Sequence, residues 1–135
     1  MTVYNLEVTV PLNVTDISRV SVPIEIEGEV LHRVYILIPF GHMELTGIRI
    51  RYGDKQIVPW NEGSWIKGGG RELNLTPNWI LPESPCTIWI DAYNLDVCYD
   101  HTFYITLETT TYQEVFGPEL YPQVIDQLAK VLGVV

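Results

Sequence analysis

Three histidines and two cysteines are the residues of this 135-residue chain best suited to catalysis or metal binding. His32 falls in a β-rich segment, whereas His42 and His101 stand in or beside turns. The HExxH and Cys-x-x-Cys motifs that hold zinc are both missing. The nearest approach to an acid–base or metal pair is His42 with Glu44, or Asp100 with His101. Turn and capping roles are commoner for such residues, so we expect no metal, no cofactor and no enzyme.

Signatures of nucleophilic or phosphate chemistry are equally weak. The chain contains no Gly-x-Ser-x-Gly, and the only histidine near Cys98 in sequence is His101. The glycine triplet 68–70 lacks the Lys-Ser/Thr that completes a phosphate loop, which favours a flexible surface tip.

Residues 86–93 and 101–109 predict the two arms of one long antiparallel hairpin around which the chain is organised. Both are rich in the β-branched and aromatic residues that suit a pleated surface. With this pairing Cys86 would face a residue near Leu107, too far from Cys98 for a disulfide. We therefore expect two free thiols, as in a reducing compartment.

Short apolar or alternating segments recur along the first 109 residues and are joined by Gly- and Pro-rich turns. The segment 30–38 is almost continuously apolar, which predicts burial on both faces. About eight strands with no helix between them predict a single antiparallel β-sandwich over residues 1–111, wired as a jelly roll or another Greek key. The expected strands are 3–10, 19–27, 30–38, 45–52, 56–58, 72–75, 86–93 and 101–109.

The pattern changes in residues 112–135, which we expect to form a linker over 112–117 followed by a short amphipathic helix. Such a helix is unstable alone, so it must pack on something. It either folds back over an open end of its own sandwich or lies on a neighbouring subunit. In the second case the assembly interface consists of Leu120, Val124, Ile125, Leu128 and Leu132.

The net charge of −9, with only eight basic residues, argues against the phosphate-binding surface that nucleic-acid recognition needs. No apolar run reaches the roughly 18 to 20 residues of a membrane span. The first ten residues do not resemble a secretory signal. We expect neither nucleic acid nor membrane as a partner.

Tryptophans in predicted loops offer another kind of site. Trp60, Trp65 and Trp79 could form the flat aromatic platform of a carbohydrate-binding module. The commoner role for such residues is to cover the ends of a small core.

Four stretches resemble small all-β structural proteins of viruses and proviruses of bacteria and archaea. These stretches are Ile-Pro-Phe-Gly-His at 38–42, Leu-Thr-Gly-Ile at 45–48, Pro-Trp-Asn-Glu-Gly-Ser-Trp-Ile at 59–66, and Ala-Tyr-Asn at 92–94 with Asp-His-Thr at 100–102. The similarity runs from Leu31 to Leu107 and carries over no catalytic residue. It implies a capsid decoration, minor capsid or appendage subunit that binds copies of itself or another virion protein, assembled in the host cytoplasm.

Overall fold

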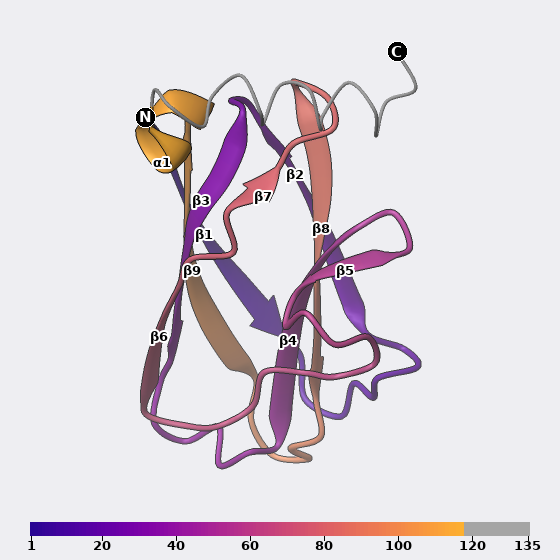
Figure 1. Cartoon of the computed structure of the whole chain (residues 1–135). Helices are drawn as coiled ribbons and strands as arrows, with labels where there is room; N and C mark the ends of the chain where they lie inside the picture. Colours follow the sequence, from indigo (N-terminus) through magenta and orange to yellow (C-terminus); the bar gives the residue numbers. More distant parts are fainter. Residues whose placement is uncertain (118–135) are drawn as a thin grey trace.

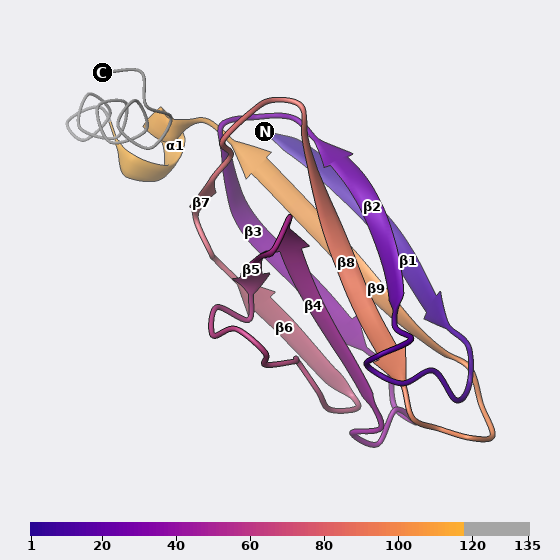
Figure 2. The ribbon, with the colours of Figure 1, turned by 90° about the vertical axis from the view of Figure 1, so that its right-hand side faces the viewer.

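The structure is a computed structural model that describes residues 1–117 of the chain (Figure 1). Nearly all of their regular structure is β, in two sheets packed face to face (Figure 2). Outside the described residues lie the predicted C-terminal helix and the five predicted interface side chains, Leu120, Val124, Ile125, Leu128 and Leu132.

All strand pairings within the two sheets are antiparallel. Sheet A has the order β1-β9-β3-β6, with β7 also paired to β3. Its strands are β1 (Thr2–Val10), β3 (Val30–Ile38), β6 (Arg71–Leu75), β7 (Trp79–Ile80) and β9 (His101–Thr110). Sheet B has the order β2-β8-β4-β5. Its strands are β2 (Val20–Ile26), β4 (Thr46–Tyr52), β5 (Lys55–Val58) and β8 (Cys86–Asn94).

These two strand orders are those of a jelly roll. Among the described strands, the chain crosses from one sheet to the other at β1–β2, β2–β3, β3–β4, β5–β6, β7–β8 and β8–β9. The predicted antiparallel β-sandwich is confirmed, and of the two wirings expected the jelly roll is the one observed. An additional short strand, β7, lies between the expected strands 72–75 and 86–93.

The core lies between the sheets and is filled mainly by alternate apolar residues of the long strands. Ile48, Ile50, Ile88, Ile90 and Phe103 are fully buried members of one continuous apolar cluster. Burying one such side chain contributes about 1.5–3 kcal/mol relative to leaving it exposed. The alternation in the sequence thus determines which face of each strand points inward.

The predicted hairpin of residues 86–109 is wrong. β8 belongs to sheet B and β9 to sheet A, and residues 95–100 cross between them. The side-chain amide of Asn94 donates to the carbonyls of Val10 and Tyr99, which fixes the crossing. Adjacent strands that each bury one apolar face have the same sequence pattern whether they pair in one sheet or face each other across a core.

Both thiols are free, as predicted, but for a different reason. Cys86 is buried at the first residue of β8, and Cys98 is exposed beyond its last residue. Burial raises the pKa of the Cys86 thiol to about 11, with a smaller contribution from the charge of Glu83. Nine residues of extended chain, roughly 30 Å, separate the two ends of that strand.

Two further expectations change. β3 is buried mainly on one face, because Tyr35 and Leu37 are only partly covered. Residues 112–117 are not a simple linker but contain α1 (Tyr112–Phe116), whose N-cap Thr111 accepts a hydrogen bond from the backbone N–H of Glu114. Tyr112 is buried and packs on Val30, with Ile80 beside them.

Candidate functional site

Two of the weak catalytic candidates, His42 and His101, lie against each other with ring centroids 4.5 Å apart. His42 is 1% exposed. Its Nδ1 lies 2.7 Å from Oγ1 of Thr46, and its Nε2 lies 3.2 Å from the carbonyl oxygen of Thr102. Burial, followed by the charge of His101, lowers the His42 pKa to about 4. Both ring nitrogens have partners, so His42 anchors its loop and is not available as a metal ligand or a base.

His101 is held in turn by Asp96. Its Nε2 is 2.8 Å from Oδ2 of that carboxylate. The backbone N–H of Cys98 donates to Asp96, and together with His101 it holds the Asp96 pKa below its ordinary value. Among the described residues no group of three or more His, Cys, Asp or Glu could hold a metal ion.

Three loops lie at one end of the sandwich: 11–19, 39–45 and 95–100 (Figure 2). His42 belongs to the second of them, and His101 directly follows the third. Backbone hydrogen bonds tie the loops together, from Asn13 to Asp96 and from Leu95 to Leu45, each 2.8 Å long. This end of the molecule is therefore a connected surface and not three independent loops.

That surface is apolar at its most exposed points. Eight of the twelve large hydrophobic side chains that are exposed in the described chain lie on these three loops. We call them the loop-end surface; they are Leu12, Ile17, Phe40, Met43, Leu45, Leu95, Val97 and Tyr99. Ile17 is 90% exposed and Phe40 is 89% exposed. The sequence signal for this surface was the presence of apolar residues within turn-rich segments.

Charges around the loop-end surface are mainly negative. Asp16, Glu44, Asp96 and Asp100 lie on the same three loops, and Arg19 is the only Lys or Arg there. An anionic membrane attracts Lys and Arg and would repel this end. In residues 1–117 no helix is long and apolar enough to cross a membrane.

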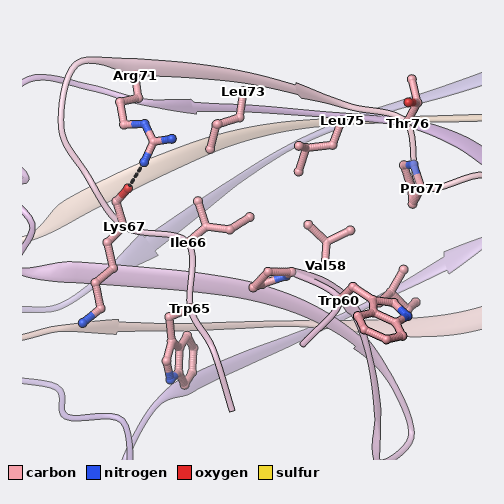
Figure 3. A pocket seen from close by; sticks show the side chains of 12 residues that line it. Val58, Trp60, Trp65, Ile66, Lys67, Arg71, Leu73, Leu75, Thr76 and Pro77 are labelled. Atoms are coloured by element: carbon pink, nitrogen blue, oxygen red, sulfur yellow. Dashed lines mark hydrogen bonds between the residues drawn. The ribbon is translucent and has the colours of Figure 1, made fainter. Parts of the chain in front are cut away.

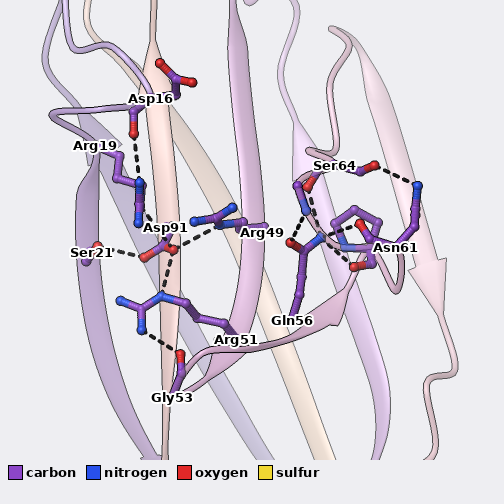
Figure 4. A network of polar contacts seen from close by, with 12 residues as sticks. Asp16, Arg19, Ser21, Arg49, Arg51, Gly53, Gln56, Asn61, Ser64 and Asp91 are labelled. Atoms are coloured by element: carbon purple, nitrogen blue, oxygen red, sulfur yellow. Dashed lines mark hydrogen bonds and ion pairs between the residues drawn. The ribbon is translucent and has the colours of Figure 1, made fainter.

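The outer face of sheet B carries a second cluster, in which three arginines surround Asp91 (Figure 4). Asp91 is fully buried, although it points away from the core. Nε of Arg51 and Nε of Arg49 lie 2.8 and 3.0 Å from its Oδ2, and Ser21 donates to Oδ1. The sequence hint was one carboxylate within the apolar β8 and two arginines, Arg49 and Arg51, two residues apart on β4. The register places Arg49 directly opposite Asp91 and Arg51 opposite Trp89.

Aromatic rings cover two of the three guanidinium groups. The Arg49 guanidinium lies 4.3 Å from the ring of Trp65, and that of Arg51 lies 5.3 Å from the ring of Trp89. Trp65 also makes an edge contact with Tyr93 at 4.8 Å. Cation–π contacts of this kind, together with the buried carboxylate, fix the arginines in place.

A groove of about 500 Å³ opens between the edge strands β5 and β6 (Figure 3). Its walls are mostly apolar and include Val58, Ile66, Leu73 and Leu75. Trp60 and Trp65 line one side of it. Lys67 and Arg71 line it as well, joined by a hydrogen bond from Arg71 Nη1 to the Lys67 carbonyl. The groove exists because the two sheets separate at these edges, leaving Leu73 and Leu75 only partly covered.

The three predicted tryptophans do not form one platform. Trp60 is 85% exposed at the groove, and Trp65 is partly buried against Arg49. Trp79 packs instead on Tyr52, with ring centroids 5.5 Å apart.

Neither a protein-family model nor a curated protein matches this sequence. Function must therefore be inferred from the surfaces themselves.

Proposed function

We propose that this protein is a non-enzymatic structural subunit that assembles with further copies of itself on a virus particle, as a capsid decoration, minor capsid or appendage protein. The observation that carries the assembly part is the loop-end surface. The viral part rests on the resemblance of residues 38–48, 59–66 and 92–102 to virion proteins. The protein would be located in the virus particle, which is assembled in the host cytoplasm.

Contiguous exposed apolar side chains mark interaction sites on soluble proteins. Phe40, Met43 and Tyr99 belong to the aromatic and Met residues that are enriched at protein interfaces. The loops that carry them are fixed by hydrogen bonds and by the buried His42, so little conformational entropy is lost on binding. Jelly rolls occur in capsid proteins and also in lectins, so the fold alone does not decide the function.

Light scattering after size-exclusion chromatography, over a range of protein concentrations, tests the proposal. We expect the wild-type chain to show a mass above that of the monomer, and the double substitution Ile17→Ser with Phe40→Ser to lower it. Tyr104→Ser, which removes an exposed ring from the outer face of sheet A, is the matched control. A wild-type chain that stays monomeric at every concentration would refute self-assembly.

The segment 118–135 is proposed as a second contact through Leu120, Val124, Ile125, Leu128 and Leu132. Removing the residues after Gly117 leaves α1 and Tyr112 in place. If the segment binds a neighbouring copy, the mass in solution falls. An unchanged mass assigns the segment to its own chain.

Carbohydrate binding is the second candidate, favoured by the exposed ring of Trp60 beside the groove. A glycan array followed by titration of tryptophan fluorescence tests it. Saturable quenching that Trp60→Ala or Trp65→Ala abolishes would support a lectin-like function. Absence of quenching by every glycan that the array selects would remove this candidate.

A further inference from the structure

The β3–β4 loop, residues 39–45, is built to present side chains outward. Phe40 is 89% and Met43 is 77% exposed, and the buried His42 between them anchors the loop. Met43 and Glu44 have φ values of 49° and 61° in the left-handed region, which is uncommon for residues other than glycine. Strained backbone held in place by its surroundings is typical of functional sites.

The glycine triplet supports this loop from one side. A Cβ on Gly69 would lie 3.0 Å from the backbone nitrogen of Met43. On Gly70 it would lie 2.4 Å from the Phe40 ring. The triplet predicted to be a flexible tip is therefore the surface on which the β3–β4 loop rests, and glycine is needed there for close approach.

The β5–β6 groove has the opposite shape and charge. It is concave and apolar, with the exposed Trp60 on one side. Lys67 and Arg71 give it positive charge, whereas Glu44 and Asp16 give the loop-end surface negative charge. A projecting apolar loop with an acidic residue and a concave apolar groove with two basic residues are complementary.

We propose that the β3–β4 loop of one copy inserts into the β5–β6 groove of the next copy, with Phe40 and Met43 against Trp60 and Leu75, and Glu44 near Lys67. This inference rests on the proposed assembly function and names its two contact surfaces. The contact is heterologous, so repeating it produces a ring or a filament. An isologous contact between two loop-end surfaces would instead bring Asp16, Glu44, Asp96 and Asp100 of both copies together, and like charges oppose that.

Complementation between two defective full-length variants tests this arrangement. The loop variant carries Phe40→Ser and Met43→Ser, and the groove variant carries Trp60→Ala and Leu75→Asp. Each variant alone should be monomeric by light scattering; if removal of the residues after Gly117 lowers the wild-type mass, both variants carry that truncation as well, so that only the loop and groove contact is measured. Their equimolar mixture should form a 1:1 dimer and nothing larger, because one intact loop and one intact groove remain.

Circular dichroism establishes that each variant is folded. If Leu75→Asp prevents folding, Trp60→Ala alone serves as the groove variant, because an exposed ring can be removed without opening a cavity in the core. Tyr104→Ser should leave the wild-type mass unchanged.

Other outcomes overturn the inference in distinguishable ways. A groove variant that keeps the wild-type mass shows that the groove is not an interface between copies. Two monomeric variants that fail to combine show that the loop and the groove do not bind each other, which overturns the inference while the proposed assembly function survives. A monomeric wild type removes both proposals.

Discussion

Asp91 on β8 and Arg51 on β4 are joined by a hydrogen bond of 2.8 Å, from Nε to Oδ2, on the face of sheet B that points away from the core. Asp91 is nonetheless fully buried, because Arg19, Arg49 and Arg51 lie around it. The side chains that bond to this enclosed carboxylate link β2, β8 and β4 and so hold the three strands in register.

Asp91→Asn should lower the free energy of unfolding by about 3 kcal/mol, because it leaves clustered guanidinium groups without their buried counter-charge. Urea unfolding at pH 7 measures the change. Glu25→Gln, an exposed carboxylate on the neighbouring β2, is the control and should change stability by less than about 0.5 kcal/mol. If both substitutions changed the free energy of unfolding by the same amount, the cluster would contribute no more to stability than an exposed carboxylate does.

Burial opposes ionisation of Asp91, but hydrogen bonds from Arg51, Ser21 and Arg49 outweigh it and hold its pKa below the ordinary value of 3.8. The unfolded chain therefore takes up this proton first as the pH falls. The stabilisation is fully present above pH 3.8 and is lost through the lower pKa of the folded state. The free energies of unfolding of wild type and Asp91→Asn, plotted against pH, should converge below pH 3.8. A constant difference between the two free energies at every pH would contradict this.

His42 should make stability fall between pH 6.5 and about 4. Its folded-state pKa is lowered to about 4 from 6.5, so the unfolded state binds the proton first. Its contribution is complete above pH 6.5 and decreases by roughly 3 kcal/mol down to the folded pKa. His42→Gln should remove about one bound proton from this pH dependence. The plot of unfolding free energy against pH should therefore be less steep for His42→Gln than for the wild type between pH 6.5 and about 4. An unchanged slope would assign the pH dependence to other groups.

Gly47→Ala should destabilise the protein by about 1–3 kcal/mol through overpacking. The added Cβ would lie 2.3 Å from Cε1 of Tyr93, whose ring is 4% exposed and is packed against Trp65. Thermal and urea unfolding measure the loss. A double-mutant cycle with Tyr93→Ala tests the cause: removing the ring should make Gly47→Ala nearly neutral. Additive effects would mean that the clash is not with Tyr93.

Gln56→Ala should loosen residues 59–64, which carry Trp60. The buried Gln56 amide Nε2 lies within hydrogen-bonding distance of the carbonyls of Pro59, Asn61 and Ser64, and its Oε1 accepts from the N–H of Gly63 (Figure 4). We expect a loss of about 1–3 kcal/mol and faster hydrogen exchange at the Gly63 amide. Asn61→Ala, which removes only an exposed side-chain bond to Ser64, is the control. Unchanged exchange at Gly63 would contradict this role.

The fold class could be predicted from the sequence because strand identity depends on local alternation. Val8 and Val10 on β1, and Ile88 and Ile90 on β8, are buried as their spacing predicts. The edge position of β2 also follows from local chemistry, since Pro23 has no N–H to donate.

The tertiary structure alone decided which strands are neighbours. β8 and β9 are adjacent in sequence yet lie in different sheets. Their sequence pattern could not distinguish the two arrangements, because two strands bury their apolar faces in one core equally well when they pair in one sheet and when they lie opposite each other in two sheets. It also decided the candidate site. Phe40, Ile17 and Val97 come from three loops, and they form one surface only because long-range hydrogen bonds and the buried His42 bring those loops together.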